Sequence, residues 1–91
     1  MHRFLYAGRA YRLSFWRTAH GAGVDYVLET PEETIPIEVK STESPSAADT
    51  KHLTLFLDTY PRKARRAFLV CRCRAPQRLT DRVEAVPWWL L

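Results

Sequence analysis

The stretch from Gly21 to Thr42, GAGVDYVLETPEETIPIEVKST, decides the fold of this chain. It predicts two β-strands joined by a tight polar turn, because apolar and polar residues alternate on both sides of the TPEE segment at 30–33. Side chains along a strand point to its two faces in turn. The expected apolar faces are Val24, Tyr26 and Leu28 in the first strand, and Ile35, Ile37 and Val39 in the second.

The register of this hairpin brings two carboxylates together. If Glu29 and Thr34 close the turn, counting back along both strands sets Asp25 directly opposite Glu38. Directly opposed residues have Cβ atoms about 5 Å apart, and like charges in that arrangement repel. A cation between the carboxylates would remove the repulsion, so the pattern predicts a metal site. The alternative is that both carboxylates lie on a solvent-exposed face.

Lys40 lies on the same face of the second strand as Glu38. Mg²⁺ prefers oxygen ligands, and one or two carboxylates commonly hold it together with water and phosphate oxygens. A neighbouring lysine can orient the attacking water and offset charge on the phosphorus. Asp25, Glu38 and Lys40 therefore supply what metal-assisted phosphodiester hydrolysis requires.

Length and composition describe one small folded domain. The chain has 91 residues, of which 46% are hydrophobic and 12% aromatic, as in globular chains. It contains no apolar run of about 18 residues, and its first residues lack the apolar region of a secretory signal. We expect a cytoplasmic location.

The charges are unevenly placed, with a formal net charge of +4. Basic residues dominate positions 62–78, which contain no acid, whereas the acids concentrate around the hairpin. A basic flank beside an acidic centre suits a polyanion that approaches a metal; the alternative is an ordinary solubilising surface. Nucleic acid is the expected partner, with DNA favoured over RNA, and the candidate binding residues are Arg17, Arg62, Lys63, Arg65 and Arg66.

Further strands and one helix complete the domain. Alternating aromatic residues predict a strand at 11–18, and residues 4–6 form either a short strand or a lead-in. After the helix, an apolar run predicts a buried strand at 67–73, parallel to the strand that carries Glu38. Residues 75–81 are expected to be a loop and 83–86 a last short strand.

The helix is expected at 47–60. Ser46 followed three residues later by Asp49 is typical of a helix start, and Pro61 ends the segment. Between them apolar residues recur at helical spacing, at Leu53, Phe56, Leu57 and Tyr60. The expected fold class is therefore α/β, with a three-stranded antiparallel meander, a crossover helix and one or two further strands in a mixed sheet.

Some residues have two interpretations. His20 could ligate a metal or be exposed in its turn, and Trp16 could stack on a base or pack in the core. Cys71 and Cys73 are expected to be buried small hydrophobes, not a disulfide. The apolar tail at 87–91 should pack on the core or on a second molecule.

Several motifs in combination resemble a known family. They are WRT at 16–18, G-x-x-VDYVLE at 21–29, IPIEVKS at 35–41, L-x-x-FL-x-x-YP at 53–61 and PWW at 87–89. The first three are similar to the PD-(D/E)XK nuclease superfamily. All five resemble, more narrowly, the C-terminal DUF4143 domain of prokaryotic AAA-type ATPases, and the resemblance covers about residues 11–91.

The resemblance implies a restriction-endonuclease-like core in which Asp25 and Glu38 bind Mg²⁺ or Mn²⁺ and Lys40 is catalytic. The superfamily often adds a carboxylate from a helix before the meander, and this chain begins after that helix. The narrower family commonly has glutamate in place of Gly23. The chain also lacks the phosphate-binding loop of an ATPase, so it is expected to be a fragment or truncated form of an ATPase-linked protein.

Two functions stay open at this point. One is a metal-dependent nuclease. The other is a domain that has lost catalysis and serves an AAA-type ATPase as a nucleic-acid-binding or protein-binding appendage. Without the first helix, one face of the sheet and the apolar tail are incompletely covered, so a homodimer is expected.

Overall fold

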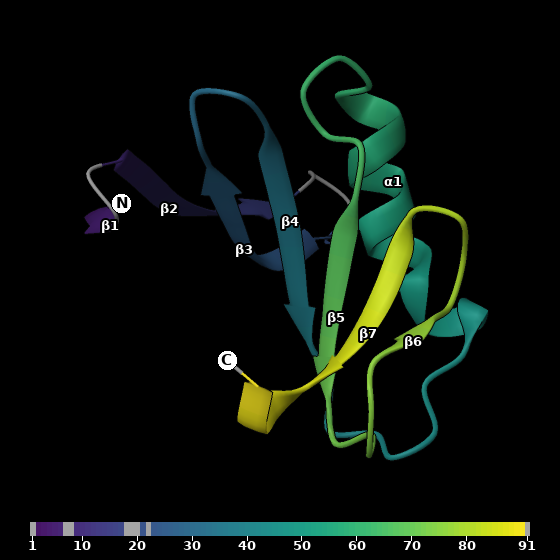
Figure 1. Ribbon diagram of the computed structural model, residues 1–91. Helices are drawn as coiled ribbons and strands as arrows, with labels where there is room; N and C mark the ends of the chain where they lie inside the picture. Colours follow the sequence, from purple (N-terminus) through teal and green to yellow (C-terminus); the bar gives the residue numbers. More distant parts are fainter. Residues whose placement is uncertain (1, 7–8, 18–20, 22, 91) are drawn as a thin grey trace.

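A computed structural model of the chain describes residues 2–6, 9–17, 21 and 23–90 (Figure 1). Within these residues, seven strands form one sheet in the order β1-β2-β3-β4-β5-β7-β6. A 3-10 helix, η1 (Ala47–Thr50), leads into the α-helix α1 (Lys51–Thr59), and a second 3-10 helix is η2 (Trp88–Leu90). The strands are β1 (His2–Tyr6), β2 (Arg9–Arg17), β3 (Gly23–Glu29), β4 (Thr34–Val39), β5 (Ala67–Cys71), β6 (Gln77–Arg78) and β7 (Val83–Pro87).

The sheet is mixed, which confirms the expected α/β class. Strands β1 to β4 are antiparallel neighbours, and β5 lies parallel to both β4 and β7. The helix α1 makes the crossover between β4 and β5, as predicted. In the part of the chain that the structure describes, no helix precedes the meander. Residues 4–6, left open by the sequence, belong to the strand β1.

One element was not expected. The two residues of β6 pair antiparallel with β7, inside the segment predicted to be a loop. The outer edge of β7 presents backbone groups that need hydrogen-bond partners, and a passing loop segment can supply them. The prediction of a loop at 75–81 was therefore wrong for this short pairing.

The helix begins with a tighter turn than the sequence predicted. The backbone N–H of Ser46 donates to Oδ2 of Asp49 at 2.9 Å, as in a capping box. The first turn is the 3-10 helix η1, and α1 continues to Thr59. The predicted helix at 47–60 is thus confirmed in position, with its start in 3-10 form.

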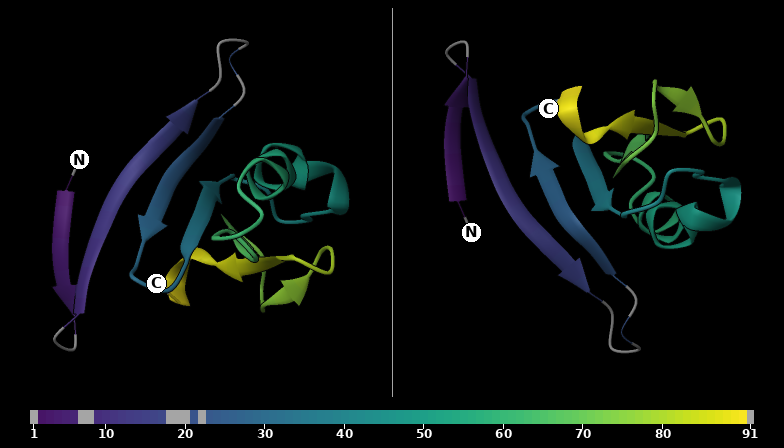
Figure 2. Two further views of the ribbon diagram at one scale, coloured as in Figure 1. Left: turned by 90° about the horizontal axis from the view of Figure 1, so that it is seen from above. Right: turned by 90° about the horizontal axis from the view of Figure 1, so that it is seen from below.

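The hydrophobic core lies between α1 and one face of the sheet. Figure 2 shows α1 against one side of the sheet, with β1 extending away from it. Leu53, Phe56 and Leu57 provide the buried face of the helix. They pack with buried residues of the sheet and of the segment before β5, which are Val24, Val27, Ala64, Ala67, Leu69 and Val83.

The two cysteines are buried and free. This confirms the prediction that they are buried small hydrophobes and not a disulfide. Their Sγ atoms lie 3.3 Å apart, in contact but not bonded. Burial raises the pKa of the Cys73 thiol, and the neighbouring Cys71 raises it further. Both cysteines pack next to Ala85 in a small buried cluster, and the raised pKa favours the neutral thiol of Cys73.

The apolar tail is mostly exposed in the part that the structure describes, although Pro87 is fully buried. The residues Trp88, Trp89 and Leu90 of η2 are 61%, 56% and 50% exposed. On the face of the sheet opposite α1, Tyr26 and Val39 are also exposed. The prediction that the tail packs on the core is therefore confirmed for Pro87 and wrong for Trp88, Trp89 and Leu90.

Candidate functional site

The hairpin that carries the site has the predicted register. Glu29 pairs with Thr34, and the ladder continues to the pair of Tyr26 with Ile37. One step further along, Asp25 reaches β4 through its side chain: Oδ2 accepts a hydrogen bond from the backbone N–H of Val39 at 2.8 Å. The carboxylate of Asp25 is therefore held at the end of β4 that carries Glu38.

A β-bulge in β3 interrupts the alternation expected from the sequence. Ser14 of β2 pairs with Val27 and Trp16 pairs with Val24, so Phe15 stands opposite two residues, Asp25 and Tyr26. The extra residue brings both Val24 and Val27 to the core face. The prediction that Val24, Tyr26 and Leu28 share one face was wrong for this reason.

The bulge also contains a residue of the candidate site. Bulges commonly change the direction of a side chain beside a functional site, and Asp25 lies within this one.

Glu38 lies beneath the helix and not on a solvent-exposed face. It is only 8% exposed, and its Oε1 lies 3.5 Å from Nδ1 of His52 on α1. Burial raises the pKa of Glu38, and the charge of Asp25 adds to the effect, whereas Lys40 and His52 oppose it. The charge of Asp25 therefore disfavours ionisation of Glu38.

Lys40 is anchored by its backbone and paired through its side chain. Its N–H donates to the carbonyl of Val70 on β5 at 2.9 Å. Its Nζ lies 3.5 Å from Oδ1 of Asp49, a contact in which both side chains are partly exposed. The N–H of Ser46, and then Lys40, hold the pKa of Asp49 below its usual range. The residue that caps the helix start is therefore also the partner of the candidate catalytic lysine.

His52 and Asp49 are the residues of the site that the sequence did not predict as partners. They lie three residues apart where η1 passes into α1, so one face of this segment presents them to the end of β4. The sequence does show that positions 49 and 52 share one face of a helix. This spacing indicates partners for Glu38 and Lys40 only when the helix is known to cross over β4. His20 lies outside the described residues.

Within the described ranges, protein side chains alone do not form a metal cage. Among the residues that the structure describes, no three His, Cys, Asp or Glu side chains form a group able to hold a metal ion. Asp25 and Glu38 supply two carboxylates, and Nδ1 of His52 lies 3.5 Å from the second. Any cation here would need ligands from water or substrate.

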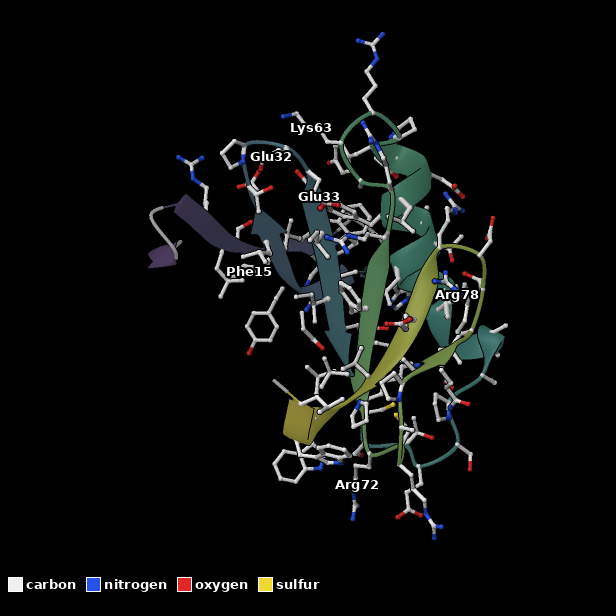
Figure 3. All side chains as sticks on the ribbon, viewed as in Figure 1. Phe15, Glu32, Glu33, Lys63, Arg72 and Arg78 are labelled. Atoms are coloured by element: carbon white, nitrogen blue, oxygen red, sulfur yellow. The ribbon has the colours of Figure 1, made fainter. Side chains whose placement is uncertain are left out.

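The candidate nucleic-acid-binding residues do not form one patch with the later arginines. Figure 3 shows Lys63 near Glu32 and Glu33 at one end of the molecule and Arg72 at the opposite end. The strand β5 runs between these ends, and five extended residues span about 17 Å. The basic run of the sequence is therefore divided between two ends of the sheet.

The five candidates themselves differ in their surroundings. Arg66 is bound to Glu33 through two hydrogen bonds, of 3.1 Å and 2.8 Å. The Nζ of Lys63 lies 3.4 Å from the carbonyl of Pro31. All five residues are exposed, and Arg62 and Arg65 lie beside Lys63 in the chain. Arg17 donates to the carbonyl of Gly21 at 3.3 Å.

Fold and site together define a small mixed α/β domain in which a hairpin places two carboxylates and a lysine beside the start of a crossover helix. The chain belongs to the family described as "Domain of unknown function (DUF4143)", which it matches over residues 1–91. No curated protein and no solved structure matches the chain. In the described part of the chain, no helix has both the length and the apolar character needed to cross a membrane.

Proposed function

We propose that this domain binds nucleic acid and, with Mg²⁺ or Mn²⁺, hydrolyses phosphodiester bonds at Asp25, Glu38 and Lys40. The observation that carries the proposal is the buried carboxylate of Glu38, whose pKa is raised by burial and by the charge of Asp25. Burial and mutual repulsion disfavour two ionised carboxylates, and a bound cation would stabilise both.

The donor set fits a hard divalent cation. The observed contacts use Oε1 of Glu38 and Oδ2 of Asp25, so the second oxygen of each carboxylate would be a ligand. Mg²⁺ is commonly held by one or two carboxylates together with substrate phosphates, without an all-protein cage. When bound, the metal would polarise the phosphoryl oxygens and lower the pKa of a coordinated water.

The remaining work falls to Lys40. Its backbone bond to Val70 fixes where the side chain starts, and the 3.5 Å contact with Asp49 is loose enough to exchange for a phosphate oxygen. An ammonium in that position offsets the negative charge that develops on the phosphoryl group. Lys40 therefore stabilises the transition state and orients the attacking water.

Calorimetric titration with Mn²⁺ tests the metal site. The native chain should bind the ion and Asp25→Ala should not, while Asp81→Ala, which removes an exposed carboxylate elsewhere, should bind like the native chain. Equal binding by the native chain and Asp25→Ala would remove the metal site.

Nicking of supercoiled plasmid DNA in Mn²⁺ tests the reaction. Cleavage should be lost in Lys40→Ala and kept in Lys51→Ala, a nearby exposed lysine. Cleavage that survives in Lys40→Ala would exclude this lysine from the reaction.

A second function is favoured by the contacts that already engage the site. Lys40 contacts Asp49, Glu38 contacts His52, and Asp25 is bound to the backbone of Val39. A site held together in this way suits a domain that has lost catalysis and binds nucleic acid or protein as an appendage of an AAA-type ATPase, as the family resemblance suggests. DNA binding with no Mn²⁺ binding and no cleavage would decide for this function.

A further inference from the structure

We infer that the cavity beside the C-terminal end of α1 is a nucleobase subsite, which takes one unstacked base of a single DNA strand. The inference rests on the proposed binding of nucleic acid. The cavity has a volume of about 670 Å³ and lies between β2, β3 and the last turn of α1. It is large enough for a base, since ligand pockets commonly measure about 300–1,000 Å³.

One wall of the cavity is aromatic. Trp16 meets Phe56 edge-on, with ring centroids 5.2 Å apart. Tyr60 lies 6.4 Å from Trp16 and 4.9 Å from Phe56, measured between centroids. The Nε1 atom of Trp16 donates to the Tyr60 hydroxyl at 3.2 Å, which fixes the orientation of both rings. Bases stack on such side chains irrespective of sequence, because every base has a π-face.

The mouth of the cavity carries cations. Arg62 and Lys63 both line it and are exposed. Phe15, which is 80% exposed, lies on the same lining. A base that enters from the mouth leaves its own phosphate outside, where the two cations can bind it. The charge of the mouth therefore complements a nucleic-acid backbone.

Polar groups are also present inside the cavity. Ser14, Glu29 and Thr34 belong to the lining. Hydroxyl groups and a carboxylate can accept hydrogen bonds from the amino groups and ring N–H groups at the edges of bases. The combination of an aromatic wall with a few polar groups is typical of small-ligand pockets.

The cavity lies at a suitable distance from the proposed phosphodiester site. Thr34 lines the cavity and Glu38 lies four residues further along β4. A strand rises about 3.3 Å per residue, which gives about 13 Å along its length. The bound base would therefore lie about this distance from the phosphate at Glu38.

A base can enter the cavity only when it is out of its stack. In a duplex the base is paired and stacked, and extruding it has a free-energy cost. The occupant is therefore single-stranded DNA or the unpaired end of a duplex. Double-stranded DNA would reach the cationic mouth but not the aromatic wall.

Fluorescence anisotropy with labelled oligothymidylate of about 16 nucleotides tests the inference in low salt without metal. An abasic oligomer of equal length carries the same phosphates but no bases. We expect the abasic oligomer to bind about tenfold more weakly, the effect of losing one base–aromatic stack. Equal affinity for the two oligomers, or no binding of either, overturns the subsite.

Variants test whether the preference for base-containing DNA depends on the cavity. Trp16→Leu should weaken binding of oligothymidylate by about tenfold, whereas Trp88→Leu, an exposed tryptophan outside the cavity, should not. Because Trp16 also packs on the core, its variant is used only if its circular dichroism spectrum matches the native one.

A second pair of variants does not touch the core. Arg62→Glu should weaken binding more strongly than Arg74→Glu, which makes the same charge change at an exposed position away from the cavity. Equal weakening by the two variants overturns a cationic mouth at this place.

The subsite and the proposed function fail in different ways. Asp25→Asn should abolish Mn²⁺-dependent cleavage and leave the preference for base-containing over abasic oligomers unchanged. Loss of that preference in Trp16→Leu, with the preference kept in Asp25→Asn, would assign the preference to the cavity and not to the catalytic site. If the native chain cleaves DNA but shows no preference, the subsite is wrong and the proposed function stands.

Discussion

The Nδ1 atom of His52 lies 3.5 Å from the Oε1 atom of Glu38, so a residue of the helix contacts a buried carboxylate of the sheet. The contact connects α1 to β4 at the end where Asp25 and Lys40 also lie. Because the pKa of Glu38 is raised, its ionisation can be measured through the pH dependence of stability.

Glu38→Gln should stabilise the protein at neutral pH. Because the pKa of Glu38 is raised above its ordinary value of 4.5, the folded state binds the proton more tightly than the unfolded state. This contribution to stability is fully present below the ordinary pKa and is lost as the pH rises through the raised pKa. Glutamine cannot ionise, so the Glu38→Gln variant does not lose this stability as the pH rises.

Thermal unfolding of the native chain and of Glu38→Gln, measured from about pH 4 to about pH 7, tests this prediction. This range includes the ordinary pKa. The variant should have the higher Tm at the upper limit, and the difference should vanish at the lower one. A gain of 1 kcal/mol would raise Tm by about 4–8 °C in a domain of this size. Glu84→Gln serves as the control. Equal Tm values across the range would contradict the prediction.

The ion pair of Glu33 with Arg66 joins the β3–β4 turn to the segment that enters β5. Its two hydrogen bonds hold the pKa of Glu33 below its ordinary value of 4.5, chiefly because Arg66 donates to it. The stabilisation is therefore present above the ordinary pKa and is lost as the pH falls through the lowered one. Both side chains are partly exposed, which limits its size.

Arg66→Ala should cost about 0.2–1 kcal/mol of unfolding free energy at neutral pH. Urea denaturation of the single and double variants with Glu33→Ala gives the coupling energy, and the coupling should shrink in acid. Arg65→Ala, its exposed neighbour, should have a smaller effect. A coupling energy that stays constant down to pH 3, roughly, would argue against the pair.

Gly23 is required by a close approach of two backbones. A Cβ atom at this position would lie 2.5 Å from the carbonyl oxygen of Trp16 and 3.3 Å from Cα of Arg17. Gly23→Ala should therefore destabilise the protein by about 1–3 kcal/mol, as overpacking does. At this position β2 and β3 lie too close for any side chain.

Urea denaturation measures this effect, with Gly21→Asn as the matched control. Gly21 has φ of +87°, and a Cβ atom added there would meet only open space. Asparagine tolerates that left-handed conformation better than most other residues, so the control should lose little stability. A Gly23→Ala variant as stable as Gly21→Asn would contradict the close approach.

We expect a homodimer formed through the exposed apolar residues. Trp88 and Trp89 lie in η2, and Tyr26 and Val39 lie exposed on the face of the sheet opposite α1. Exposed apolar groups of this kind are typical of interaction surfaces. Light scattering should give the mass of a dimer for the native chain and of a monomer for the double variant Trp88→Ser/Trp89→Ser. A native monomer at high micromolar concentration would exclude the dimer.

The sequence by itself determined the elements that depend on local patterns. The polar turn and the alternation beside it were enough to predict the pair of Glu29 with Thr34, because register in a hairpin follows from the turn. The helical spacing after Ser46 was enough to place α1. Both depend on residues close together in the chain. Their conformational preferences can be inferred from the sequence without the rest of the fold.

Only the tertiary structure decided how the site is assembled. The bulge at Asp25 depends on how β2 pairs with β3, which broke the alternation that the sequence predicted. The partners of Glu38 and Lys40 come from His52 and Asp49, because the helix crosses over β4 with that face toward the sheet. The basic run was divided because β5 carries the chain across the sheet. Each outcome depends on long-range packing, which sets the distance between residues far apart in sequence.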